Sequence, residues 1–130
     1  MRLAVSPDGS RAYVTARKDN AVLVFDTSKF ALDSAHAKIA EIGVGTAPVP
    51  VAVLDAGNTI MVGNSNRFSG RQSKPESITI IDGQSNRVLG AIPAGSFPRD
   101  IVDSPDHQTR NIANFGSNTI DVWGRMHLAR

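Results

Sequence analysis

The sequence has no cysteine, few aromatic residues and no long apolar run. Without cysteine, the 130-residue chain cannot form a disulfide, a thiolate metal site or a thiol nucleophile. No apolar stretch approaches the ~20 residues of a transmembrane helix, so we expect no membrane insertion. The residues Met1–Gly9 lack the long apolar stretch of a signal peptide, so the sequence predicts none here.

The charges of the chain are nearly balanced. A total of 14 Lys and Arg residues against 12 Asp and Glu residues gives a formal net charge of +2, which is too small to predict nucleic acid as a partner. Hydrophobic residues make up 41% of the chain and charged residues 20%, which excludes a wholly disordered protein. The length suits one domain with a single core.

Three motifs recur along the chain in the same order, and the first and third copies align without a gap at an offset of 98 residues. They are a turn motif, a β-branched strand motif and an exit motif with a glycine and a proline. The copies are Ser6–Gly9, Leu54–Gly57 and Ser104–His107 for the turn, Val22–Asp26, Ile78–Asp82 and Ile120–Trp123 for the strand, and Ile42–Pro48 and Ile92–Pro98 for the exit. Such internal repetition indicates a repeat architecture.

Apolar residues within each repeat alternate with a period of two, which is typical of strands. In the middle repeat the pattern predicts strands at Val49–Leu54, Thr59–Asn64, Ser77–Asp82 and Arg87–Ile92. The third of these is apolar on both faces, which is typical of a strand packed between two sheets. Four short antiparallel strands per repeat predict a β-propeller blade, with a β-sandwich as the alternative.

The fold class predicted from the sequence is therefore all-β, with about two and a half to three blades of an incomplete ring. We expect one partial propeller over residues 1–130, divided into blades at 1–48, 49–98 and 99–130. The Ala-rich stretch Phe30–Lys38 predicts an inserted loop with one helical turn. An open array exposes apolar sheet faces at its ends, so the expected partners are further blades of a longer chain or copies of itself. Of these, the fragment interpretation is favoured.

The Pro-Asp-Gly turn at Pro7, the Tyr13-Val14-Thr15 run, the strand Asn20–Thr27 and the exit Ile42–Pro48 together resemble the YVTN-type β-propeller repeat family. The resemblance extends from residue 3 to about residue 123. Ala16 replaces the family's Asn in the first copy, whereas Asn64 and Asn114 retain it. The resemblance implies a ring of about seven blades, a periplasmic, secreted or cell-surface location in bacteria, and either a binding role or a lactonase-like one.

The sequence shows no catalytic constellation. His36, His107 and His127 have no partner at metal-ligand spacing, and no nucleophile elbow, phosphate loop or dinucleotide motif is present, so we expect no metal and no cofactor. Four aspartates recur at equivalent places, which indicates a structural role in turns. They are Asp8, Asp26, Asp82 and Asp106.

Arg99, Asp100 and Asp103 depart from the repeat, because Asp100 and Asp103 correspond to Arg2 and Val5 in the first copy. The first strand of a propeller blade lines the central channel, so these three residues are candidates for a polar channel wall; a frayed first strand is the alternative. For a lactonase-like enzyme, the catalytic candidates are His107, Asp100 and Arg99.

The long loop between Asn64 and Glu76 is the most distinctive segment. Its cations surround one phenylalanine and suit an anionic sugar, a carboxylate or a phosphate, although an ordinary solvated loop has the same composition. With the equivalent loops of the other copies, the candidate ligand-binding residues are Arg17, Asn64, Asn66, Arg67, Arg71, Lys74 and Asn114. Nucleic acid is not favoured, because the aromatic and cationic footprint is small.

Together these features favour a propeller segment that serves as a binding scaffold for a small anionic ligand or a protein, with polar loops on one face. The alternatives are part of a lactonase-like hydrolase and a truncated fragment without independent function. The sequence favours a binding role over an enzyme, since nothing in it marks a general base beside a nucleophile.

Overall fold

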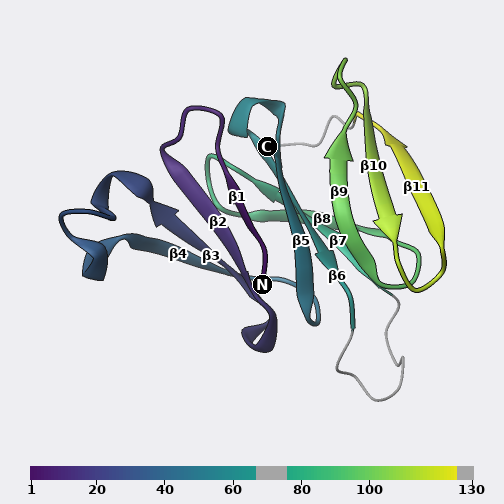
Figure 1. The fold of residues 1–130 in the computed structure, drawn as a ribbon, viewed down its shortest axis with the longest axis horizontal. Coiled ribbons are helices and arrows are strands. Elements are labelled where there is room, and N and C mark those ends of the chain that lie inside the picture. The colour runs from purple at the N-terminus through teal and green to yellow at the C-terminus, as the bar shows by residue number, and fades with distance from the viewer. Residues whose placement is uncertain (67–75, 126–130) are drawn as a thin grey trace.

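The computed structural model describes residues 1–66 and 76–125. These residues form three antiparallel sheets that follow one another along the chain (Figure 1). We call the sheets blades 1, 2 and 3. Blade 1 contains β1 (Leu3–Val5), β2 (Arg11–Ala16), β3 (Ala21–Asp26) and β4 (Lys38–Gly43). Blade 2 contains β5 (Pro48–Leu54), β6 (Thr59–Asn64), β7 (Ser77–Asp82) and β8 (Val88–Pro93), and blade 3 contains β9 (Pro98–Asp103), β10 (Thr109–Asn114) and β11 (Thr119–Gly124).

Each blade is a meander in which the strands pair in sequence order. The first strands β1, β5 and β9 lie beside one another, and the later strands follow outward from them (Figure 1). The predicted fold class is therefore confirmed: the chain is all-β and built of propeller blades. Two of the four strands predicted for the middle blade have the observed bounds; the first begins one residue earlier than predicted, and the fourth is shifted by one residue at both ends. The predicted burial of β7 on both faces is also confirmed, because Ile80 and Ile81 are fully buried.

In the part of the chain that the structure describes, four short 3-10 helices connect the strands: η1 (Arg17–Asp19), η2 (Thr27–Lys29), η3 (Ser34–His36) and η4 (Asp55–Gly57). The inserted loop between β3 and β4 contains η2 and η3, which confirms the expected helical character of that stretch. Within the described residues, no helix has the length and apolar character needed to cross a membrane.

The apolar core lies between the blades rather than inside any one of them. One cluster joins blade 1 to blade 2 and contains Tyr13, Val22, Val24, Ile42, Ile60, Val62 and Ile81. A second cluster joins blade 2 to blade 3 and contains Leu54, Met61, Ile78, Ile80, Ile101 and Ile112. Repeat units of this kind bury their apolar faces only against their neighbours.

The recurring aspartates organise turns, as predicted. The Asp8 carboxylate accepts hydrogen bonds from the backbone N–H of Ser10 (2.9 Å) and from the hydroxyls of Ser6 (2.7 Å) and Ser10 (2.8 Å). These bonds, led by the one from the Ser10 backbone, lower the pKa of Asp8 to about 2. Asp106 accepts the equivalent bonds in blade 3 from Ser104 (2.6 Å) and the Gln108 backbone (3.1 Å).

The aspartates at the ends of two equivalent strands serve the same purpose. Asp26 accepts from the backbone N–H (3.0 Å) and hydroxyl (2.6 Å) of Ser28, and these bonds lower its pKa. Asp82 accepts from the Gln84 backbone (3.3 Å) and the Ser85 hydroxyl (2.8 Å). The structural role predicted for all four aspartates is thereby confirmed.

Successive blades meet closely at a glycine and an asparagine. A Cβ atom placed on Gly45, in the exit of blade 1, would lie 2.6 Å from Cγ of Asn64 in blade 2. The same contact recurs one blade later, where a Cβ on Gly95 would lie 2.8 Å from Cγ of Asn114. Distances this short leave no room for a side chain, so the glycine of the exit motif is required for the blades to approach each other.

Candidate functional site

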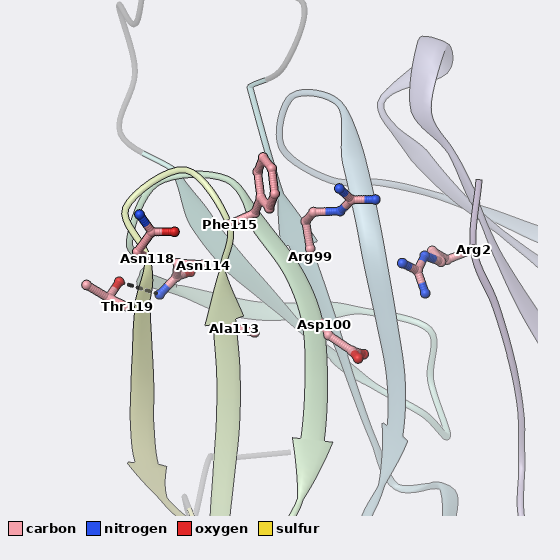
Figure 2. A pocket seen from close by; sticks show the side chains of 8 residues that line it. All are labelled: Arg2, Arg99, Asp100, Ala113, Asn114, Phe115, Asn118 and Thr119. Carbon is pink, nitrogen blue, oxygen red and sulfur yellow. Dashed lines mark hydrogen bonds between the residues drawn. The ribbon is translucent and has the colours of Figure 1, made fainter.

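A pocket of about 410 Å³ opens at the end of the inner strands (Figure 2). It lies where β9 begins and β10 ends, and it also includes one residue that precedes β1. Its lining residues are Arg2, Arg99, Asp100, Ala113, Asn114, Phe115, Asn118 and Thr119. A concave site with a few convergent polar groups is the usual form of a small-molecule site.

Arg99 is held at this pocket by two aromatic rings. Its guanidinium carbon lies 5.2 Å from the ring centroid of Phe115 and 5.7 Å from that of Phe97. The two rings pack edge to face, with their centroids 5.9 Å apart. Each contact has the geometry of a cation–π interaction, so the rings hold the guanidinium without neutralising its charge.

The backbone of Phe97 adopts a left-handed conformation, with φ of 57°. Ala47 occupies the same place before the exit proline of the preceding repeat and has φ of 51°. This conformation is therefore a property of the exit motif, and in blade 3 it presents an aromatic ring beside Arg99.

Arg2 lines the same pocket as Arg99 and Asp100, and Figure 2 shows the Arg2 side chain extending toward the side on which these two residues lie. The backbone of Arg2 is fixed on β2, because its N–H donates to the Thr15 hydroxyl (2.9 Å) and its carbonyl accepts from the Thr15 N–H (3.0 Å). Asp100 accepts a hydrogen bond from the adjacent Ile101 N–H (3.0 Å). With two guanidinium groups and one carboxylate, the pocket has an excess of positive charge.

The three catalytic candidates do not come together in the structure. Arg99 and Asp100 line the pocket just described, whereas His107 lies in a second pocket, of about 560 Å³, that also includes Asp55 and Arg125. His107 takes the place of Gly9 in the repeated turn and has φ of 60°. Its ring Nδ1 is 2.7 Å from Asp103, which therefore belongs to this second region rather than to the pocket at Arg99.

The second pocket lies over an ion-pair network that joins blades 2 and 3. Arg110 is 3% exposed and lies 2.6 Å from Asp55 and 3.2 Å from Asp103, and Arg125 approaches the same Asp55 oxygen at 3.3 Å. Burial raises the pKa of Asp55, but the hydrogen bonds from Thr59 and Arg110 and the charges of both arginines outweigh it, so the pKa is lowered. Because the carboxylates here are paired, this region is a structural junction.

The structure places the predicted ligand-binding residues in different regions. Asn64 and Asn114 are only 1% and 2% exposed, and Nδ2 of Asn64 donates to Ser77 and Thr79, while Nδ2 of Asn114 donates to Asp121 (2.8 Å). Both asparagines thus act in the packing between blades, although Asn114 also forms part of the pocket wall.

The remaining predicted residues lie elsewhere. Asn66 is 6% exposed, and its N–H donates to the carbonyl of Thr46 (3.1 Å). Arg17 borders a smaller pocket, of about 290 Å³, with Met1 and Lys18. The other three, Arg67, Arg71 and Lys74, lie outside the described residues.

Several contributors to the site at Arg99 were not among the predicted site residues: Phe97 beside the pocket, and Arg2, Ala113, Phe115, Asn118 and Thr119 in its lining. The repeat alignment contained one usable signal, since it places Arg2 and Asp100 at equivalent positions of blades 1 and 3. Phe97 occupies a spacer position of the exit motif, where the first copy has Ala47, and Phe115 lies in the connection after β10, so the repeat fixes the residue type at neither position. Among residues 1–66 and 76–125, no group of three or more His, Asp or Glu side chains has the arrangement of a metal site.

Comparison with known proteins gives similarity at the level of the fold. No family model matches the chain, and no curated protein matches it. Among solved structures, hydrazine synthase from Kuenenia stuttgartiensis is 26% identical with a TM-score of 0.77, and the match covers 98% of this chain and 34% of that one.

Two candidate 6-phosphogluconolactonases are similar as well. The one from Bacteroides uniformis is 22% identical with a TM-score of 0.75, and the match covers 98% of this chain and 37% of that one. The one from Bacteroides fragilis is 18% identical with a TM-score of 0.78, and the match covers 98% of this chain and 36% of that one. The chain thus spans little more than a third of the length of the structures it matches, and these likenesses agree with the blade architecture described above.

Proposed function

We propose that this chain is a propeller segment that binds a small anionic ligand, carrying a carboxylate or phosphate, in the pocket between Arg2 and Arg99. The observation that supports this most directly is the placement of Arg99, whose charged group is held over Phe97 and Phe115 at the pocket wall. A guanidinium presents a planar array of donors that matches a carboxylate or a phosphate. We also infer that the chain is related to the YVTN-type propellers, on the motifs of its sequence.

The charges around the pocket support the same ligand class. None of the described carboxylates forms an ion pair with Arg2 or Arg99, so both guanidinium groups can serve a ligand. Arg99 is exposed, and the rings of Phe97 and Phe115 favour the position of its guanidinium at the pocket wall through cation–π contacts. Asn118 and Thr119 add neutral polar groups that suit the hydroxyls of a sugar acid.

The test uses 6-phosphogluconate, which carries both anionic groups, and isothermal titration calorimetry at low ionic strength. We expect the wild-type chain to bind it and Arg99→Gln to bind it about 10- to 100-fold more weakly, because a hydrogen bond to a charged group contributes about 1.5–3 kcal/mol. Lys18→Gln is the matched control, since it removes the same charge from the smaller pocket beside Arg17. Neither the wild-type chain nor Arg99→Gln should bind neutral glucose detectably.

Two results would contradict this proposal. One is an absence of binding of 6-phosphogluconate to the wild-type chain. The other is an equal loss of affinity in Arg99→Gln and Lys18→Gln, because that would assign the attraction to net charge rather than to this pocket.

A lactonase-like hydrolase is the second candidate function, favoured by the two candidate lactonases among the similar structures and by the carboxylate of Asp100 in the same pocket. In such a reaction Asp100 would accept a proton from water as the water oxygen attacks the lactone carbonyl, and the ring C–O bond would break with a proton returning to the leaving oxygen. Hydrolysis of glucono-δ-lactone should then fall at least 100-fold in Asp100→Asn while 6-phosphogluconate still binds. Equal rates in the wild type and Asp100→Asn would eliminate this alternative.

A further inference from the structure

The outward face of blade 3 carries exposed apolar side chains. We call the face of a blade that points toward the next blade its front face, and the opposite one its back face. In blade 3 the front face carries Val102 on β9 and Ile120 and Val122 on β11, which are 55%, 68% and 62% exposed.

The strand positions of Ile120 and Val122 are fully buried in the other two blades. Ile120 and Val122 correspond to Val22 and Val24 in blade 1, which are both 0% exposed, because blade 2 covers them. In blade 2 the equivalent residues are Ile78 and Ile80, at 0% and 1%, and blade 3 covers these. The front face of blade 3 therefore has the composition of a surface that another blade covers.

The complementary surface lies at the other end of the array, on the back face of blade 1. Leu3 and Val5 on β1 are 61% and 48% exposed. Leu3 corresponds to Ile101 in blade 3, which is 7% exposed and packs against blade 2, and to Val51 in blade 2, which packs against the cluster shared with blade 1. One chain thus carries both halves of the interface that its own blades form twice.

We propose that the front face of blade 3 binds the back face of blade 1 of a second copy of this chain, head to tail. The contact continues the interface between blades that the structure shows, so the second copy supplies a surface of matching shape and apolarity. Because the two surfaces differ, the contact is heterologous, and it produces a closed ring or an extended assembly rather than a two-fold dimer.

The packing within each copy selects blade 1 as the occupant. The back faces of blades 2 and 3 are covered by blades 1 and 2 of the same copy, through the two apolar clusters described above. Blade 1 is therefore the unit of a second copy whose back face is open to dock on blade 3. Blade 1 has Ala12 at the position that Arg110 occupies in blade 3, so docking it brings no buried charge that needs a partner from the other copy.

Two blocked variants of the 130-residue chain test the proposal. Ile120→Lys/Val122→Lys places charges on the front face of blade 3, and Leu3→Lys/Val5→Lys places them on the back face of blade 1; all four positions are exposed, so folding should be retained and can be verified by circular dichroism. Light scattering coupled to gel filtration then measures the mass of each protein against the 13.8 kDa of one chain.

We expect the wild-type chain to form assemblies that grow with concentration, and each blocked variant to be monomeric by itself. Mixing the two variants should restore a single complex of one copy of each, because each contributes the surface that the other has lost. Leu32→Lys is the control: it replaces an apolar residue that is 92% exposed in the loop between β3 and β4, and it should assemble like the wild type.

Three outcomes would overturn the proposal. A wild-type chain that stays monomeric at ~100 μM has no such interface of useful strength. Blocked variants that fail to combine when mixed would show that the two faces are not partners. If the variant blocked on blade 1 still pairs with itself while the variant blocked on blade 3 does not, the contact is front to front rather than head to tail.

Discussion

At the scale of single residues, the contact between Gly45 and Asn64 shows how little space separates successive blades. The repeat of this contact at Gly95 and Asn114 means that two features of the sequence, an exit glycine and an asparagine at a strand end, belong to one interaction. The asparagine side chain fills the space that a larger residue at the glycine would need. An apolar pattern alone predicts neither residue, because the constraint is one of volume between two different sheets.

This close fit gives a prediction with a control two residues away. Gly45→Ala should lower the free energy of unfolding by about 1–3 kcal/mol, since the added methyl group overlaps the Asn64 side chain. Gly43→Ala should change it by less than about 0.5 kcal/mol, because a Cβ at Gly43 has no atom within 4 Å. Urea unfolding followed by circular dichroism measures both, and equal stabilities for the two variants would refute the role given to Gly45.

At the scale of strands and turns, the junction of blades 2 and 3 differs from that of blades 1 and 2 by its ion-pair network. Arg110 on β10 takes the place that Ile60 occupies on β6, and its partners come from η4 and β9. A buried ion pair is no stronger than the apolar packing it replaces, but loss of one partner leaves the other buried and unpaired. The junction therefore depends on Arg110 more than on any single apolar residue near it.

Arg110→Leu should lower the free energy of unfolding by about 3 kcal/mol at pH 7. In the wild type the pKa of Asp55 is lowered, so its ionised form stabilises the fold above the unfolded-state pKa of about 3.9, and this contribution is lost as the pH falls through the lower folded value. Without Arg110, the folded pKa of Asp55 should rise, because its burial is then opposed only by the Thr59 hydrogen bond and the charge of Arg125. The difference in the free energy of unfolding between Arg110→Leu and the wild type should then shrink as the pH falls from 7 to 4.5.

Denaturant unfolding at the two pH values measures this effect. Arg87→Leu is the control, because Arg87 is an exposed arginine just before β8 and its replacement should have a small effect that is the same at both pH values. A deficit in Arg110→Leu that does not change between pH 7 and 4.5 would mean that Asp55 is not the group left unpaired.

At the scale of the whole molecule, the sequence predicted the blades because every blade repeats the same physical requirements. Turns with an aspartate, strands with a period of two and an exit glycine recur, so a single copy such as Ser77–Asp82 could be checked against its counterparts. The fold class and the strands of the middle blade followed from this repetition.

The site at Arg99 could not be predicted in the same way, because it is built from departures from the repeat. Arg2 and Phe115 are far apart in sequence and line one pocket only because β1, β5 and β9 lie beside one another. The prediction that His107 would join Arg99 and Asp100 rested on nearness in sequence. The two ends of a strand lie far apart, at opposite ends of the sheet. His107 follows the end of β9, so it lies in a different pocket from Arg99, which is near the start of β9.

The left-handed backbone at Phe97 bears on how the pocket would bind the proposed ligand. A bulky residue in that conformation is strained by about 1–2 kcal/mol, which packing in the surrounding fold must offset. Under the proposed function, a backbone held in this conformation by the fold would present the Phe97 ring beside Arg99 before the anion binds. Such preorganisation would lower the entropic cost of ordering that part of the pocket wall.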